Sequence, residues 1–315
     1  MYRKVAIFGA SGYISKYLIQ EYLDKSDEIF LISDRSENIA EKYKRNQNIH
    51  VLKGSIGEEE IGKRLISENV DCFVNLYAQT DILFAERNAN LDFQINVLSV
   101  VNFLSLLIQN RHQCNFFQIG TVTQFGLTPP SPIDESYESN PETIFDLHKN
   151  LIEEYLKAID GKYGFRGISI RLSNVYGGES GQFSGNRGVV NRVIELAKAK
   201  NRISVYGDGH YYRNYIHVLD VAKCIQKLTS LSDFPSNTMV MLIGNESHTL
   251  REVWEKIADI VSKKIDNNVI VENQDWPEGT MQIEKRNFFG KNDLLKSLIG
   301  NHKFLSIDDG LKKMS

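Results

Sequence analysis

A glycine turn between a short apolar strand and a helix constrains this chain more than any other feature of its sequence. Lys4–Phe8 is apolar and partly β-branched, which predicts a buried strand, and Gly9 closes it. From Gly12 onward, apolar and aromatic residues recur at helical spacing, and a second apolar run, residues 28–34, ends in a carboxylate. Strand, glycine turn, helix, strand and acidic residue, in this order, are typical of a βαβ unit that binds a dinucleotide.

The spacing of the turn also bears on which dinucleotide binds. Gly9 and Gly12 permit a tight turn and the close approach of a pyrophosphate to the N-terminus of the helix. Asp34 lies 22 residues after Gly12, where a carboxylate accepts hydrogen bonds from the adenosine ribose. Arg35, directly after it, is instead suited to a 2′-phosphate. The pattern therefore indicates NAD and leaves NADP open.

The alternation of strands and helices continues along the chain. Apolar runs predict further strands at residues 49–53, 71–76, 115–119 and 167–172, and two long amphipathic helices at 90–109 and 141–159. Such alternation predicts an α/β fold, a Rossmann-type doubly wound parallel sheet covered on both faces. We expect this dinucleotide-binding domain in residues 1–172, with segments around 213–246 returning to it, and a smaller C-terminal substrate-binding lobe in residues 173–315.

Composition excludes several other classes of protein. The chain has 315 residues, of which 42% are hydrophobic and 24% charged, as in soluble globular proteins. Its net charge of -3 argues against a nucleic-acid partner, and no apolar run reaches the roughly 18 residues that suggest a membrane span. Three cysteines without paired spacing predict reduced thiols in the cytoplasm. Seven histidines without ligand spacing predict no metal site.

Motifs spread along the chain match one known family. Residues 9–15 are similar to a GxxGxxG turn, with Ser15 at the last glycine, and residues 119–126 to a catalytic serine/threonine loop. Residues 171–177 match R-x-x-N-V-Y-G, and 205–220 match an aromatic-Gly-x-Gly stretch followed by Arg and Asp. Together these segments resemble the extended short-chain dehydrogenase/reductase family, in its group of nucleotide-sugar epimerases, dehydratases and ketoreductases.

The resemblance implies where a nicotinamide dinucleotide binds. Asn96 matches the family's helix asparagine, and Ser55 replaces an aspartate that contacts adenine in relatives. The implied cofactor residues are Gly9, Ser11, Gly12, Tyr13, Ile14, Asp34, Arg35, Ser55, Ile56, Leu76, Ala78, Asn96 and Lys149.

The resemblance also implies a nucleoside-diphosphate sugar as substrate, bound in a cleft between the two lobes. In relatives the aromatic residue at the position of Tyr206 stacks on the nucleobase, and the arginine at Arg213 grips a phosphate, roles that suit these side chains. The implied substrate residues are Thr121, Thr123, Asn174, Arg187, Tyr206, Arg213 and Arg286. The two long helices imply a homodimer joined by a four-helix bundle.

The catalytic motif of the family is incomplete in this chain. A Tyr-x-x-x-Lys pair and a Ser/Thr hydroxyl implied by the resemblance would stand at residues 145, 149 and 121, but residue 145 is Phe145. The substitution keeps the ring of a tyrosine and removes its proton donor. Phe145 is either an introduced change, a natural feature of a catalytically silent nucleotide-sugar binding protein, or a sign that another group supplies the proton. Thr121, Thr123, His148 and water are the alternative donors.

The residues after Thr121 narrow the reaction. Relatives that eliminate water carry an Asp-Glu pair there, whereas this chain has Val122 and Thr123, neither of which exchanges a proton readily at neutral pH. This disfavours a 4,6-dehydratase and leaves two reactions that the resemblance implies. Because Asp34 favours NAD, the first is epimerisation of C4 of the sugar through a 4-keto intermediate. An NAD(P)H-dependent reductase of 4-keto-6-deoxy nucleotide sugars is the alternative.

Overall fold

The protein is described by a computed structural model of residues 4–178, 188–231 and 233–314. The chain forms two compact units. Unit 1 comprises Met1–Gln124, Pro141–Arg171 and Ala222–Val240, and unit 2 comprises Phe125–Asn140, Leu172–Val221 and Met241–Ser315. The sequence predicts that all of residues 1–172 belong to the first domain, but residues 125–140 group with unit 2. There, Ile133 pairs with Gly290, and the Thr128 hydroxyl donates to the carbonyl of Asn287.

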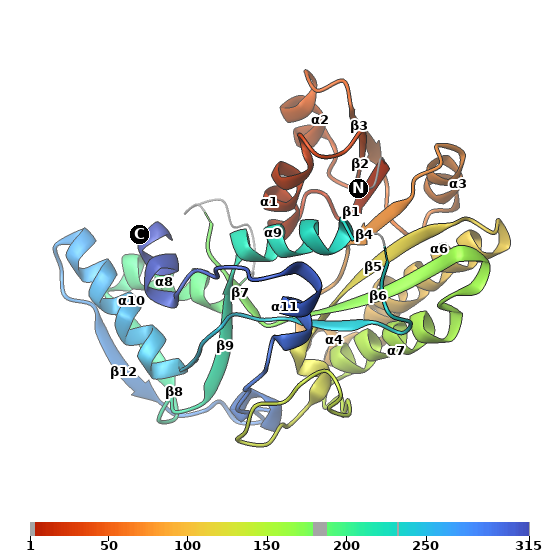
Figure 1. The fold of residues 1–315 in the computed structure, drawn as a ribbon. Helices are drawn as coiled ribbons and strands as arrows, with labels where there is room; N and C mark the ends of the chain where they lie inside the picture. The colour runs from red at the N-terminus through yellow and green to blue at the C-terminus, as the bar shows by residue number, and fades with distance from the viewer. Residues whose placement is uncertain (1–3, 179–187, 232, 315) are drawn as a thin grey trace. The chain divides into compact units, whose positions relative to one another are not determined.

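Unit 1 is built on a parallel sheet with helices on both faces (Figure 1). The seven strands lie in the order β10-β6-β5-β4-β1-β2-β3, and the pairings of β1 with β2 and β4, of β2 with β3 and of β4 with β5 are parallel. The strands are β1 (Lys4–Phe8), β2 (Glu28–Ser33), β3 (Ile49–Lys53), β4 (Cys72–Asn75), β5 (Cys114–Thr121), β6 (Phe165–Leu172) and β10 (Met239–Leu242). The predicted Rossmann-type fold is confirmed.

The helical elements of this part of the chain follow the strands in alternation. They are α1 (Tyr13–Tyr22), α2 (Glu37–Tyr43), α3 (Glu59–Ser67), α4 (Ile82–Arg87), α5 (Ala89–Phe93), η1 (Gln94–Leu98), α6 (Ser99–Gln109), η2 (Val122–Phe125), α7 (Ile144–Ile159), η3 (Lys162–Gly164) and α9 (Val218–Thr229).

The two long helices differ in detail from their prediction. α7 begins at Ile144, three residues later than predicted from 141, because the Thr143 side chain caps it by accepting from the backbone N–H of Asp146. The predicted helix 90–109 contains a π-helical turn, η1, between α5 and α6. Sequence periodicity does not reveal such a turn, which is common near functional sites.

The stretch Ala89–Gln109 is apolar enough, by length and composition only, to cross a membrane. Polar residues interrupt this stretch, so it contains no unbroken apolar run of that length. Core helices of globular proteins pass the same test, and here Val100, Phe103 and Leu104 are buried in the core of unit 1.

Aromatic side chains dominate that core. The ring of Phe103 lies 4.9 Å from the ring of Phe8 and 5.2 Å from that of Phe73, in edge-to-face contacts that join α6 to β1 and β4. Burial of such rings is the main favourable term in folding, and the edge-to-face geometry adds to it. The sheet is thereby held rigidly against α6.

Unit 2 contains two smaller sheets and its own core. One sheet has the order β11-β9-β7, and the other pairs β12 with β8 (Figure 1). Its core includes Tyr176, Ile194, Trp254 and Ile257. The elements are β7 (Asn174–Tyr176), α8 (Val189–Lys200), β8 (Arg202–Tyr206), β9 (Tyr212–His217), β11 (Ser247–Thr249), α10 (Leu250–Ile265), β12 (Ile270–Gln274), η4 (Gln282–Lys285), α11 (Asp293–Ile299) and α12 (Ile307–Met314).

A buried ion pair ties α7 to β6. The Arg171 guanidinium donates to both carboxylate oxygens of Glu153, at 3.0 and 2.7 Å, and the Ser169 hydroxyl donates at 2.8 Å. Burial raises the pKa of Glu153, but the hydrogen bonds and charge of Arg171 outweigh burial and hold that pKa below its usual value. The pair therefore stabilises the fold above the ordinary pKa of glutamate, and this contribution is lost as the pH falls through the depressed pKa.

We predict that Glu153→Gln lowers the free energy of unfolding by about 3–5 kcal/mol, because it leaves a buried guanidinium without its countercharge. Urea denaturation at pH 7 measures the loss. The matched control is Glu154→Gln, which removes only the 2.8 Å surface pair with Lys157 and should cost roughly 0–1 kcal/mol. Equal losses in the two variants would contradict the assignment.

Candidate functional site

The turn after β1 is shaped by a close approach of two backbone segments. Gly9 has φ of +73°, and a Cβ atom there would lie 2.8 Å from the backbone nitrogen of Tyr77 and 2.9 Å from the carbonyl of Leu76. Position 9 therefore requires glycine for both conformation and space. The N–H of Gly12 donates to the Gly9 carbonyl at 2.8 Å, which closes the turn at the start of α1.

Ser15, which departs from the family's third glycine, has a defined place in this turn. Its side chain is fully buried, and its hydroxyl donates to the carbonyl of Gly9 at 2.7 Å. The serine thus locks the turn from inside the helix, and its hydroxyl is engaged there.

Acidic and hydroxyl groups gather where the strands on one side of the sheet end. Asp34 follows β2 and is exposed, while the backbone N–H of Ser55, after β3, donates to Glu58 at 2.8 Å. Partial burial and the neighbouring charge of Glu58 raise the pKa of Asp34, and Arg35 lowers it. Burial and the charge of Asp34 raise the pKa of Tyr77. In doubly wound sheets, ligands bind beyond these carboxyl ends, where the strand order reverses.

Most of the other predicted cofactor residues lie at the same ends of the strands. Ser11 is exposed, and its hydroxyl accepts from Ser33 at 2.8 Å. Tyr13, Ile14, Leu76 and Ala78 are half-buried, and Arg35 is exposed. The side chain of Ile56 is different, because it is buried in the core of unit 1 and offers no surface to a ligand.

Asn96 belongs to a buried network built around Asp92. The Asn96 amide donates to the Gln79 carbonyl and to the Asp92 carboxylate, both at 3.0 Å. Asp92 also lies 2.6 Å from Nδ1 of His148 on α7. Asn96, in the π-helical turn, thus holds the segment after β4 in position. His148 belongs to the same buried network through Asp92, which disfavours it as the proton donor.

The catalytic loop and α7 share a chain of hydrogen bonds. The hydroxyls of Thr121 and Thr123 lie 3.0 Å apart, and the Thr123 hydroxyl donates to the carboxylate of Asp146. Asp146 is fully buried and also accepts from the Thr143 hydroxyl at 2.8 Å. Asp146 is not among the site residues predicted from the sequence. The sequence feature that could have indicated it is a carboxylate directly after Phe145, in a helix whose neighbouring residues are buried.

Lys149 is buried next to Phe145. Its ammonium donates to the Ile119 carbonyl at 3.2 Å and lies 5.8 Å from the centre of the Phe145 ring. Burial lowers the pKa of Lys149 to about 8, and the charge of Asp92 opposes this shift. Phe145 is itself 6% exposed and places no proton donor beside the lysine. Thr121, Phe145 and Lys149 therefore lie on β5 and the first turns of α7, within one unit.

In unit 2 the two predicted phosphate arginines are neighbours. Arg213 donates to the carbonyl of Arg286 and, at 2.7 Å, to that of Glu284, so that it holds the backbone of this segment. Burial and the nearby charge of Arg286 lower the pKa of Arg213 to about 10. Two adjacent guanidinium groups repel each other unless an anion joins them, which suits this place to a diphosphate.

Tyr206 has an aromatic partner that the sequence did not indicate. Its ring is stacked on Trp276 with centres 5.2 Å apart, because β8 and β12 pair with Tyr206 opposite Gln274. The amide of Asn174 on β7 donates to the carbonyl of Asn214 at 3.0 Å. Arg187 lies outside the described residues, so its predicted role stays a prediction.

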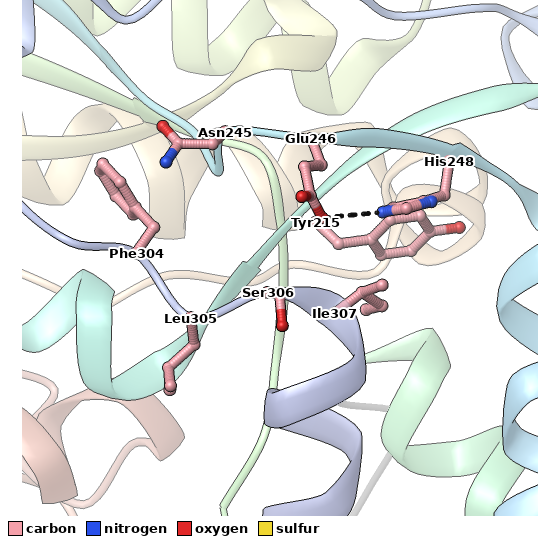
Figure 2. Close-up of a pocket in the computed structure, with 8 residues that line it drawn as sticks. All are labelled: Tyr215, Asn245, Glu246, His248, Phe304, Leu305, Ser306 and Ile307. Carbon is pink, nitrogen blue, oxygen red and sulfur yellow. Dashed lines mark hydrogen bonds and ion pairs between the residues drawn. The ribbon is translucent and has the colours of Figure 1, made fainter.

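Unit 2 contains a small cavity of about 60 Å³. Its lining includes Tyr215, Glu246 and His248, which Figure 2 shows. Glu246 lies 3.3 Å from Nε2 of the histidine. None of the predicted site residues lines this cavity. It is too small for a nucleotide.

The groups at the ends of the strands fit NAD. The glycine turn at Gly9 suits the pyrophosphate of a dinucleotide, and the Asp34 carboxylate suits the hydroxyls of its adenosine ribose. A carboxylate at this position would repel the 2′-phosphate of NADP. Lys149 supplies a buried cation with an ammonium suited to ribose hydroxyls. Among the described residues, no group of histidine, cysteine and acidic side chains is arranged to hold a metal ion.

We predict that Lys149→Met raises the free energy of unfolding at pH 7, by on the order of 1–3 kcal/mol, because it removes a charge that burial penalises. Below pH 8 the wild-type lysine is charged in both the folded and the unfolded chain, so the folded state carries the full cost of burying the charge. Between pH 8 and its ordinary pKa the unfolded chain binds more protons, so wild-type stability rises and the advantage of the variant shrinks.

Urea denaturation at pH 7 and pH 9.5 measures this difference. Lys157→Met on the same helix is the control and should lower the free energy of unfolding at pH 7. The carboxylates beside Lys157 outweigh the effect of its burial and raise its pKa. A Lys149→Met variant less stable than wild type at pH 7 would refute the penalty.

The chain is similar to several known proteins over most of its length. The dTDP-4-dehydro-6-deoxyglucose reductase of Escherichia coli is 26% identical over 265 residues, which cover 82% of this chain and 82% of that protein. The UDP-glucose 4-epimerase of Streptococcus mutans is 21% identical, over 83% of this chain and 82% of that one. The structure of the UDP-glucose 4-epimerase of Thermotoga maritima with UDP-glucose has a TM-score of 0.84 at 21% identity, covering 99% and 97% of the two chains.

The family comparison extends over most of the chain. A model described as the NAD dependent epimerase/dehydratase family matches residues 5–244, from β1 to just beyond β10. This range contains the glycine turn, the Thr121 loop and Lys149. The chain thus belongs to the NAD dependent epimerase/dehydratase family, within the extended short-chain dehydrogenase/reductase group.

Proposed function

We propose that this protein epimerises C4 of a nucleoside-diphosphate hexose through a transient 4-keto sugar. The observation that carries the proposal is the position of the Thr121 hydroxyl and the Lys149 ammonium on neighbouring elements, with no acidic pair in the residues after Thr121. NAD, when bound, accepts and returns a hydride, and residues of this chain position the sugar and exchange its proton. Val122 and Thr123 offer no acid and base for water elimination, which disfavours a dehydratase.

The substrate class is supported by unit 2. Arg213 and Arg286 form a paired cation suited to a diphosphate, and the stacked rings of Tyr206 and Trp276 offer a flat face to a nucleobase. The structural neighbour from Thermotoga maritima was solved with UDP-glucose, which supports a uridine nucleotide as the first ligand to test.

The second candidate is a 4-keto-6-deoxy nucleotide-sugar reductase. It is favoured by the similarity to the Escherichia coli dTDP-4-dehydro-6-deoxyglucose reductase over 82% of this chain. The two functions differ in how they use the cofactor. NAD that copurifies with the protein and is regenerated in each cycle supports the epimerase, whereas stoichiometric consumption of NAD(P)H with a 4-keto sugar supports the reductase.

We predict that Phe145→Tyr raises turnover about 10²- to 10⁴-fold, because it adds a positioned proton donor and acceptor one helical turn from Lys149. The assay is interconversion of UDP-hexoses that differ at C4, with bound NAD quantified in the same preparations. Phe145→Leu is the matched control, since it changes the ring without adding a hydroxyl and should give no gain.

The same experiment tests the alternative of a silent binding protein. Such a protein would bind a nucleotide sugar, shown by a rise in Tm, while neither the wild-type chain nor Phe145→Tyr turned it over. Absence of dinucleotide binding in all variants would refute the proposed enzyme outright.

We also propose a homodimer formed through exposed apolar side chains of unit 1. Leu91 and Leu98 in the α5–η1 stretch, and Leu147 and Leu151 on α7, are each more than 40% exposed. The two elements pack together, and the ring of Phe93 contacts that of His148 at 5.4 Å, so these side chains belong to adjoining helices. Adjoining apolar helical surfaces on a globular protein are typical of an interface. We also propose a cytoplasmic location. The free, buried thiols of Cys72 and Cys114 support it, because cysteines stay reduced in the cytoplasm.

We predict that Leu98→Arg combined with Leu151→Arg converts the dimer to a monomer, because each arginine would be buried without a partner at the interface. Light scattering after size-exclusion chromatography measures the mass. Ile270→Arg, a change of a 53% exposed residue in unit 2, is the control and should leave the dimer intact. A wild-type protein that is monomeric at micromolar concentration would contradict the proposal.

A further inference from the structure

We propose that a hydrogen-bonded relay from Thr121 through Thr123 to Asp146 carries the substrate proton that a tyrosine at position 145 would otherwise exchange. The inference rests on the proposed function and deepens it, because it identifies how C4 chemistry proceeds without a phenol. Thr121 is the catalytic residue that touches the sugar hydroxyl, and Thr123 and Asp146 are positioning residues that act through it.

The relay runs from an accessible hydroxyl into the interior of unit 1. Thr121 is partly exposed, Thr123 is 7% exposed and Asp146 is fully buried. The two hydroxyl oxygens are 3.0 Å apart, and the next link joins Thr123 Oγ1 to Asp146 Oδ1. Each step is therefore a single hydrogen bond, within reach of a direct proton transfer.

The direction of the hydrogen bonds follows from counting protons. A threonine hydroxyl has one proton and two acceptor positions. Thr123 donates its proton to Asp146, so the bond between the two hydroxyls must be donated by Thr121. The backbone N–H of Thr123 donates to Thr121 Oγ1 at 3.2 Å and occupies one acceptor position. The other acceptor position of Thr121 is the one that suits a sugar hydroxyl, which makes Thr121 an acceptor toward substrate.

Asp146 is held firmly at the inner end of the relay. Its second carboxylate oxygen accepts from the Thr143 hydroxyl at 2.8 Å, and its backbone N–H donates to the same hydroxyl at 3.1 Å. The carboxylate thus lies in the first turn of α7, where the helix dipole favours negative charge. Because Asp146 directly follows Phe145, the helix that lacks the phenol also carries the carboxylate that ends the relay.

The proposed step balances in protons and electrons. The C4 hydroxyl transfers its proton to Thr121 Oγ1 as the Thr121 proton moves to Thr123 Oγ1 and the Thr123 proton moves to the Asp146 carboxylate. The C4–H bond breaks, its electron pair leaves as hydride to a nicotinamide dinucleotide, and the C4–O bond becomes a carbonyl. Return of the hydride to the opposite face of the sugar, with the three proton transfers reversed, gives the C4 epimer and restores both protein and cofactor.

The test compares the relay in two backgrounds, the wild-type chain and Phe145→Tyr. Thr123→Val removes the central hydroxyl with little change of shape and should lower kcat of the wild-type chain about 10²- to 10³-fold with KM unchanged. In the Phe145→Tyr background the phenol replaces the relay, so the same change should lower kcat less than about fivefold. A structural role for Thr123 would lower kcat equally in both backgrounds.

Three further variants complete the experiment. Thr123→Ser keeps a hydroxyl and should retain wild-type kcat within about fivefold, and Asp146→Asn should reproduce the loss seen with Thr123→Val. Thr229→Val is the control: it removes a buried hydroxyl that bonds to Tyr22 and to the carbonyl of Gln226, outside the relay, so it should lower the Tm and leave kcat unchanged. Bound NAD is quantified in every variant.

Several outcomes would overturn the relay. Thr123→Val that keeps wild-type kcat, or that loses activity equally in both backgrounds, refutes it, as does a wild-type chain with no turnover of any nucleotide sugar tested. If Phe145→Tyr is then active, the proposed epimerase stands and only the relay fails. If neither chain is active although both bind NAD and nucleotide sugar, the proposed function fails as well.

Discussion

The contact between the β1 turn and the segment after β4 is the constraint on which the rest of unit 1 depends. Gly9 brings its backbone within a distance of Leu76 and Tyr77 that no side chain would permit, and Ser15 holds the turn from the helix side. This contact sets β1 beside β4, at the point where the strand order of the sheet reverses. The ends of β2, β3 and β5 then lie along the same edge, each with its own polar residue.

A second constraint acts on α7, whose inner face carries ionisable side chains in an otherwise apolar interior. Each is held by a different element: Asp146 by Thr123, His148 by Asp92, Lys149 by the carbonyl of Ile119 and Glu153 by Arg171. Buried charges cost free energy unless they are paired, so these contacts fix the rotation and height of the helix. The rotation and height of α7 in turn set the positions of Phe145 and Lys149 relative to Thr121. The missing phenol therefore leaves a well-ordered site, in which hydroxyl and carboxylate groups remain connected.

Much of the fold was predictable because it depends on local patterns. The strand Lys4–Phe8, the turn at Gly9 and Gly12 and the alternation that follows are each visible in a few adjacent residues. The predicted sheet and its helices are confirmed, with small differences at the ends of elements where capping residues such as Thr143 decide the boundary. The grouping of residues 125–140 with unit 2 was not predictable, because it depends on contacts such as Ile133 with Gly290 that are distant in sequence.

The sequence by itself determined the class of fold, the dinucleotide turn, the carboxylate at Asp34 and the loss of a phenol at residue 145. These are properties of residue type and short-range spacing. Only the tertiary structure decided that Asp146 meets Thr123, that Trp276 stacks on Tyr206, that Arg213 holds the segment carrying Arg286, and that the side chain of Ile56 belongs to the core. Each of these depends on which strands and helices become neighbours. Strand order and side-chain burial depend on how the whole chain packs, so they cannot be read from the spacing of a few adjacent residues.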